Sequence, residues 1–157
     1  MAKSSFVTAV DASSATFAIS TSTGKSTSFL GSSNAKPFTA FATYTTSGSE
    51  GAGTDIEMFA LPDDAHLIDM RVSSTALGTS VTLQVGDSGD DDRFIDATSH
   101  ASAASTSMSA TNPQSIGHKF TSDTDIVVKT AGATLAGSQT ITLYAIYIMP
   151  GLLNSAR

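Results

Sequence analysis

The 157-residue chain contains no cysteine and no tryptophan, and it has only three tyrosines. Without cysteine the protein can form neither a disulfide bond nor a thiolate metal site. The absence of cysteine does not decide between an oxidising and a reducing compartment, because a cysteine-free protein tolerates either. With so few large aromatic side chains, the sequence offers no cluster of the kind that stacks on sugars or nucleic-acid bases.

Charge of either sign is also scarce. Charged residues make up 14% of the chain, and the net charge at pH 7 is −6. A protein that neutralises nucleic-acid phosphates needs clustered lysine and arginine. The eight basic residues here are scattered, and no stretch gathers them. The sequence therefore argues against nucleic acid as a partner.

Long apolar runs are missing as well. A membrane-spanning helix needs about 20 consecutive apolar residues, whereas the longest run here, Ile141 to Met149, has the length of a strand. The opening residues, MAKSSFVTAV, lack the continuous apolar region of a secretory signal. We expect no membrane partner and no cleaved leader.

What the sequence has in abundance is serine, threonine and residues that alternate with a period of two. Residues 81–85 read VTLQV, and residues 66–74 place Ile68, Met70 and Val72 on one predicted face. Residues 36–46 (KPFTAFATYTT) show the same alternation, which is typical of strands buried on one side. Residues 54–61, 93–97, 117–122, 125–132 and 138–150 read as further strands, and residues 99–112 read as a long loop.

Seven or eight strands and no convincing amphipathic helix predict an all-β fold. The pattern favours an antiparallel β-sandwich of the jelly-roll or Greek-key type, because several connections are longer than hairpins need. We divide the chain into an extended N-terminal arm (1–36), a sandwich domain (37–150) and a short tail (151–157). The alternative for residues 1–36 is a partly disordered tail.

Apolar residues in two places are candidates for contact with a neighbouring subunit. The last strand is apolar on both faces, which is typical of a strand that is central in a sandwich or lies under a partner. A charge at Ile146 is therefore expected to damage folding or oligomerisation. The candidates are Phe6, Val7, Phe17, Ile19, Phe29 and Leu30 in the arm, and Tyr144, Ile146 and Ile148 in the last strand.

Five aspartates lie close together in residues 87–96: Asp87, Asp90, Asp91, Asp92 and Asp96. Calcium binds six to eight oxygen ligands, but the spacing here does not follow the EF-hand order. We favour a solvated turn in which residues 90–92 face water and Arg93, and the calcium interpretation stays open. An acid–base pair is less favoured, because adjacent aspartates on a loop lack the pocket that raises one pKa.

No other pattern predicts catalysis. His66, His100 and His118 are isolated and show no metal-binding spacing. The sequence has no G-x-S-x-G nucleophile motif and no phosphate-binding loop. We therefore expect a protein that is not an enzyme and has no catalytic residue, metal ligand or cofactor.

Three stretches carry a resemblance to a known family: residues 59–77 (FALPDDAHLIDMRVSSTAL), 81–97 (VTLQVGDSGDDDRFIDA) and 125–150 (DIVVKTAGATLAGSQTITLYAIYIMP). They resemble the small jelly-roll proteins of tailed bacteriophages that decorate and cement the head. The resemblance covers about Thr54 to Pro150 and depends on strand ends and turns. It leaves the first 50 residues outside and carries over no catalytic residue.

The resemblance implies a structural virion protein on the outer surface of the capsid, made in the host cytoplasm. Its implied partners are the major capsid protein and further copies of itself, as a homo-dimer or homo-trimer. One alternative within the virion is a tail, head-fibre or connector component. An alternative of another class is a calcium-stabilised extracellular binding module, which calcium should protect against thermal unfolding. An enzyme is the least favoured interpretation.

Overall fold

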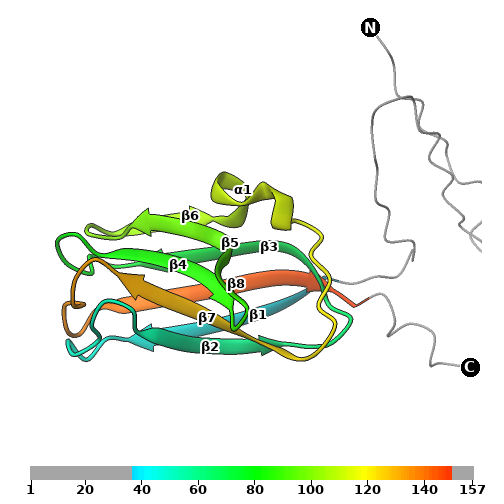
Figure 1. Ribbon diagram of the computed structural model, residues 1–157, viewed down its shortest axis with the longest axis horizontal. Helices are drawn as coiled ribbons and strands as arrows, with labels where there is room; N and C mark the ends of the chain where they lie inside the picture. Colours follow the sequence, from blue (N-terminus) through cyan, green and yellow to red (C-terminus); the bar gives the residue numbers. More distant parts are fainter. Residues whose placement is uncertain (1–36, 150–157) are drawn as a thin grey trace, which may run out of the picture.

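Eight strands and two short helical turns make up the computed structural model, which describes residues 37–149 (Figure 1). The strands are β1 (Pro37–Thr45), β2 (Asp55–Leu61), β3 (His66–Ser74), β4 (Thr82–Asp87), β5 (Asp90–Ser99), β6 (Ala104–Ser107), β7 (Thr124–Ala131) and β8 (Thr140–Ile148). Between β6 and β7 lie α1 (Met108–Thr111) and a 3-10 turn, η1 (Pro113–Ser115).

The strands form two four-stranded sheets that pack face to face. One sheet has the order β1-β8-β3-β6 and the other has the order β2-β7-β4-β5. All strand pairs are antiparallel, and the first and last strands lie side by side. Two interlocked Greek keys with this order make a jelly roll. The predicted all-β antiparallel sandwich is therefore confirmed.

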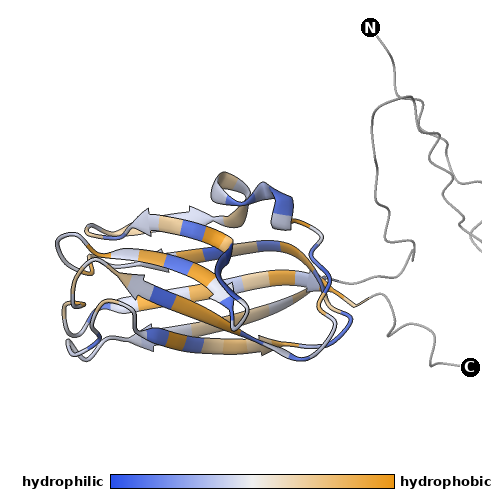
Figure 2. Cartoon of the chain, in the orientation of Figure 1, coloured by the Kyte–Doolittle hydropathy of each residue, from blue (hydrophilic) through white to orange (hydrophobic). Residues whose placement is uncertain are grey.

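The core lies between the sheets and is built from alternate residues of the strands. Figure 2 shows apolar and polar bands alternating along the strands. Val81, Leu83 and Val85 are fully buried, as their period of two predicts. Ile141 and Leu143 meet them from the opposite sheet. Each such side chain removed from water contributes about 1.5–3 kcal/mol to the free energy of unfolding.

The inward face of β3 differs from the prediction. The pairing of β3 with β8 shifts register between Leu67 and Asp69, and the extra residue forms a β-bulge. Leu67 is fully buried, whereas Ile68 is 39% exposed. Because the bulge reverses the alternation at this point, Ile68 does not share the face of Met70 and Val72, and that prediction is wrong.

Two segments also differ from their expected structures. Residues 99–112, predicted as a loop, contain β6 and α1, and Met108 of α1 is fully buried. β6 (ASTS) has no large apolar side chain, so its sequence gives no strand signal. It is a short edge strand that pairs with β3. Residues 117–122, predicted as a strand, make one isolated bridge between His66 and Lys119 and no ladder. Phe120 anchors that segment in the core, which explains its apolar signal.

Both ends of the described chain lie at the same end of the sandwich. Pro37, the first residue of β1, pairs with Ile148, the last residue of β8 (right-hand end of Figure 1). His66 of β3 pairs with Ile148 from the other side. Within residues 37–149, no helix is both long enough and apolar enough to cross a membrane.

Candidate interaction surface

The acidic stretch is a tight turn between β4 and β5, stabilised by its first aspartate. Asp87 accepts hydrogen bonds from the backbone N–H groups of Gly89 (2.8 Å) and Asp90 (3.1 Å) through one carboxylate oxygen. Its other oxygen lies 2.7 Å from Nε of Arg93. Asp87 is nearly buried, so its carboxylate has exchanged water for the two backbone donors and for the charge of Arg93.

Two further aspartates are engaged by neighbouring residues. Asp91 accepts a 2.5 Å hydrogen bond from Nζ of Lys129 on β7. Asp96 accepts a 2.6 Å bond from the side-chain amide of Asn112, which also donates to the backbone carbonyl of Asp92 at 2.7 Å. The turn is therefore held by protein donors at three of its five carboxylates.

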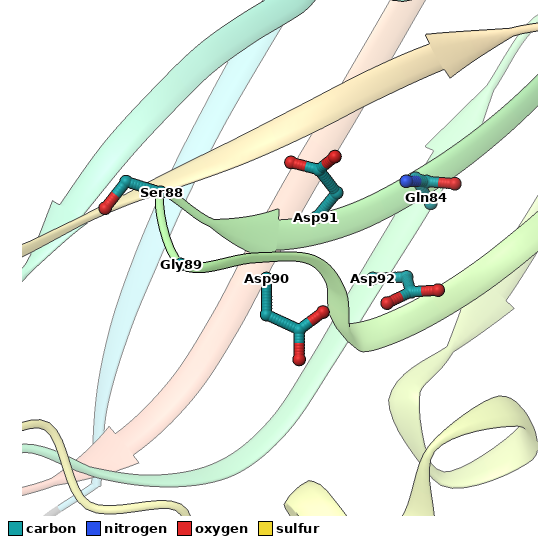
Figure 3. Close-up of a pocket in the computed structure, with 6 residues that line it drawn as sticks. All are labelled: Gln84, Ser88, Gly89, Asp90, Asp91 and Asp92. Atoms are coloured by element: carbon teal, nitrogen blue, oxygen red, sulfur yellow. The ribbon is translucent and has the colours of Figure 1, made fainter.

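The two remaining carboxylates, Asp90 and Asp92, line one hollow, to which Gln84, Ser88, Gly89 and Asp91 also contribute. In Figure 3, Asp90 and Asp92 point to one side of the strand and Asp91 points to the other. Asp90 lies so close to Asp92 that it raises the pKa of the Asp92 carboxyl, helped by desolvation and by the charge of Asp96. Across residues 37–149, no three His, Asp or Glu side chains are grouped in a way that could hold a metal ion. Residues 90–92 are exposed, as the solvated-turn interpretation expected, although β5 already begins at Asp90. The expected pairing of these residues with Arg93 is wrong, because Arg93 lies against Asp87 and Asp91 pairs with Lys129.

One serine and one histidine do meet, which the sequence did not reveal. The hydroxyl of Ser74 at the end of β3 lies 2.7 Å from Nδ1 of His100, directly after β5. His100 is fully buried, and its Nε2 has no hydrogen-bond partner among the described residues. Burial lowers the pKa of His100. A catalytic serine needs a histidine oriented by a third polar group and open to substrate, so this pair joins two strands and does not form a nucleophile.

The other two histidines also have structural surroundings. The ring of His118 stacks edge-on against Phe120 and Phe94, with centroid distances of 4.9 and 5.5 Å. Desolvation lowers the pKa of His118, and the nearby charge of Arg93 adds to the effect. His66 is half-buried at the start of β3. The three histidines do not converge on a common site.

A buried glutamate organises the loop after β1, and sequence reasoning missed it. Glu50 accepts hydrogen bonds from the hydroxyl of Tyr44 (2.7 Å), from the N–H and hydroxyl of Ser47 (both 2.8 Å) and from the N–H of Gly48 (3.0 Å). The backbone bond from Ser47, followed by the Tyr44 bond, lowers the pKa of Glu50 strongly. The sequence did offer a signal for this loop, because residues 47–51 (SGSEG) place serines and glycines around a single glutamate. Three of these four bonds come from residues 47 and 48 of the same loop, so Glu50 holds the loop in place.

The outward face of the β1-β8-β3-β6 sheet offers the apolar surface that the core does not use. Phe41 of β1 lies opposite Tyr144 of β8, which lies opposite Arg71 of β3. Directly opposite residues share a face of the sheet. The next row has Thr39 opposite Ile146 and Ile146 opposite Asp69. Phe41 is 66% exposed, and Ile68 adds a further exposed apolar side chain.

Hydroxyl side chains continue this face toward the other end of the strands. Thr43 and Thr142 approach each other to 3.3 Å across the β1–β8 pair. Ser73 and Ser105 form a 2.8 Å hydrogen bond across the β3–β6 pair. We call the whole surface, from Phe41, Tyr144 and Ile146 to these hydroxyls, the outer face.

The candidate contact residues fall into two groups. Tyr144, Ile146 and Ile148 are half-buried on the outer face, away from the core that contains Ile141 and Leu143. Their role in contact with a partner stays a prediction. The arm candidates Phe6, Val7, Phe17, Ile19, Phe29 and Leu30 lie outside the described residues.

Solved structures of phage capsids contain chains with this fold. A chain of the cyanophage Pam1 capsid asymmetric unit matches with a TM-score of 0.63 and 18% sequence identity, over 83% of this chain and 98% of the Pam1 chain. A chain of the capsid of Ralstonia phage GP4 matches with a TM-score of 0.62 and 20% identity, over 73% of this chain and 84% of its own. No protein-family model and no curated protein sequence matches the chain. At these identities the likeness is one of fold.

Proposed function

We propose that this chain is a structural virion protein that binds the outer surface of a bacteriophage head and stabilises the joints between capsomers. One observation carries the proposal: its jelly roll corresponds to almost the full length of a chain in the Pam1 capsid. The likeness to a chain of the GP4 capsid supports it independently.

The chemistry of the described residues supports a binding role. The carboxylates and histidines are used to hold turns and strands, while the outer face leaves Phe41, Tyr144 and Ile146 accessible. Exposed apolar side chains framed by polar ones mark surfaces that bind other proteins. Hydroxyls beside them form hydrogen bonds at an interface without the desolvation cost of charges.

Stabilisation of a shell follows from binding thermodynamics. A protein that binds the assembled lattice and not the free capsomers shifts the assembly equilibrium toward the lattice. Copies that bridge neighbouring capsomers gain avidity, because the lattice sets a high effective concentration for each second contact. The net charge of −6 disfavours association with packaged DNA, which suits a position outside the shell.

The test is binding of the purified full chain to emptied heads and to isolated tails of the phage that encodes it. We expect co-sedimentation with heads, and we expect Ile146→Lys to weaken it at least about tenfold, as for a residue at the centre of an interface. Ile116→Lys is the matched control, because Ile116 is 49% exposed and lies outside the strands of the outer face. Equal binding of both variants, or binding to tails alone, would contradict the proposal.

Residues 1–36 enter this proposal as an extended arm that adds contacts with the major capsid protein. An extended segment can pair with an exposed sheet edge through main-chain hydrogen bonds. Deletion of residues 2–35 is expected to leave the thermal unfolding of the sandwich in place and to weaken head binding. Unchanged head binding would remove the arm from the account.

The calcium-stabilised module is separated from this proposal by a melting experiment. A cation that binds the native state raises the unfolding temperature. The protein donors on Asp87, Asp91 and Asp96 favour a turn that needs no cation. We expect the same unfolding temperature with calcium and with EDTA. A rise with calcium would favour the extracellular module.

A further inference from the structure

A jelly roll has four edge strands, and three of them here are protected against pairing with another chain. β6 has four residues. β2 carries Asp55 and Glu57 and contains a register shift. β5 carries four aspartates and one arginine and contains two register shifts against β4. Short length, charge and bulges are the devices that prevent edge-to-edge association.

The fourth edge, β1, has none of these devices. Its nine residues, PFTAFATYT, include no charged side chain. It pairs with β8 in an unbroken register from Pro37 to Thr45. No residue of β1 is buried, and Phe41 at its centre is 66% exposed. In an antiparallel ladder, alternate residues direct both N–H and C=O away from the neighbour. Among residues 37–149 only β8 pairs with β1, so β1 presents a row of backbone groups on its other side that no described strand pairs with.

We propose that β1 pairs with β1 of a second copy of this chain, antiparallel and about a two-fold axis at Phe41. The two four-stranded sheets then join into one eight-stranded sheet. A two-fold contact uses the same patch on both copies and closes after two subunits. The proposal concerns the free chain and does not depend on the virion role proposed above.

The residues of β1 match their own reversed sequence in this register. Phe41 faces Phe41 of the second copy, which makes a cross-strand aromatic pair. Thr39 faces Thr43, so two hydroxyls can bond on either side of the axis, and Ala40 faces Ala42. Pro37, which lacks an N–H, falls at the end of the ladder opposite Thr45, where it interrupts no inner hydrogen bond.

Charge makes β1, rather than β5, the edge at which two copies of this chain can pair. Self-pairing of β1 places no like charges against each other, because the strand has none. Self-pairing of β5 would bring aspartates of the two copies together, which is destabilising. The pairing also extends the apolar part of the outer face across the axis, from Tyr144 through Phe41 to the same residues of the second copy.

The first test is the mass of the full chain in solution. We expect twice the 16.0 kDa of one chain at micromolar concentrations. Phe41→Glu should raise the dissociation constant of the dimer at least about a hundredfold, because two carboxylates then oppose each other across the axis. Ile68→Glu is the matched control on the same face, two strands away from the edge, and should stay dimeric.

The second test uses the absence of cysteine, since each introduced cysteine is then the only thiol. Opposed residues in an antiparallel pair have Cα atoms about 4.5 or 5.5 Å apart, within the range for a disulfide. Phe41→Cys should therefore give a disulfide-linked dimer under mild oxidation. Thr39→Cys should not, because its own copy lies about four residues, roughly 14 Å, along the ladder. Mixing Thr39→Cys with Thr43→Cys should restore the cross-link.

Four results would overturn the proposal: a monomeric full chain, a trimeric mass, a dimer that Phe41→Glu leaves intact, or cross-linking of Thr39→Cys alone as efficient as that of Phe41→Cys. The cysteine series keeps the test valid if the glutamate variant fails to fold. A monomer would indicate that β1 is covered by residues 1–36 of its own chain or is reserved for a strand of another protein.

Discussion

The edge strands β1 and β5 belong to the same sandwich but are treated in opposite ways. β5 is ten residues long, carries five charged side chains and is bent by two register shifts. β1 is nine residues long, uncharged and regular. Bulges and charges on an edge prevent association, and their absence permits it. The difference is the reason we propose the contact surface on the β1 side and expect the acidic stretch to keep the β5 edge from pairing.

The two edges also differ in how the molecule holds them. β5 is tied down by Asp87 with Arg93, by Asn112 with Asp96, and by the packing of Phe94 against His118. β1 is held by its ladder with β8 and by the bond from Tyr44 to Glu50 near its end. Substitution of the buried groups that tie down β5, such as Asp87, should therefore change stability, whereas substitutions on the free side of β1 should change association.

The largest expected effect comes from Gly86 of β4, where the backbone of β5 leaves no room for a side chain. A Cβ at Gly86 would lie 2.0 Å from the backbone carbonyl oxygen of Asp90 and 2.4 Å from the carbonyl carbon of Asp91. Gly86→Ala should lower the free energy of unfolding by about 3 kcal/mol, because the backbone has to move. Gly51→Ala, where a Cβ meets nothing within 4 Å, should change it by less than about 0.5 kcal/mol. Urea denaturation measures both, and equal effects would contradict the close approach.

The next effect concerns the aspartate that closes the turn. Asp87→Ala removes the acceptor of two backbone N–H groups and the partner of Arg93. We expect a loss of about 2 kcal/mol in the free energy of unfolding, as for hydrogen bonds to a charged group. The mass in solution should stay that of the parent chain. A stable Asp87→Ala variant with altered association would reverse the assigned roles of the two edges.

A smaller loss of stability is expected at low pH, and it comes from histidines that lie next to β5. The pKa values of His100 and His118 both lie below the ordinary 6.5. As the pH falls, the unfolded chain therefore binds protons first, and the free energy of unfolding declines from about pH 6.5 toward the folded pKa values. His118→Phe keeps an aromatic ring between Phe94 and Phe120 and should flatten this decline between pH 7.5 and 5.5. Urea midpoints that do not depend on pH in the parent chain would contradict the assignment.

The smallest effect is expected at Asp91. Its side chain is half exposed, and Lys129 retains Asp55 at 3.6 Å when the Asp91 carboxylate is lost. Asp91→Asn should leave the unfolding midpoint unchanged within measurement error, since exposed ion pairs contribute little. A large loss, together with a parent chain whose unfolding midpoint rises with calcium, would restore the cation interpretation of the turn.

The alternation along the chain was sufficient to predict the sandwich. Val81, Leu83 and Val85 alternate because one face of β4 meets the opposite sheet. The bulge at Ile68 was not predictable, because an extra residue in a strand is decided by its pairing with β8. β6 was missed because it is held by backbone hydrogen bonds to β3, and its small side chains show no alternation of apolar and polar residues.

The candidate surface was predictable only in part. Tyr144, Ile146 and Ile148 could be chosen because β8 is apolar on both faces, as a central strand is. Phe41 was not singled out, because its alternation is the same for an edge strand and an inner one. Which strand becomes an edge is decided by long-range pairing, here the placement of β8 between β1 and β3. The Ser74–His100 contact depends on the same long-range geometry.

The most direct measurement is a cryo-electron microscopy reconstruction of the virion that carries this chain. The account predicts jelly-roll density on the outside of the head, at joints between capsomers, with the outer face and β1 against a capsid subunit or a second copy. Density inside the shell among the packaged DNA, or on the tail alone, would contradict it.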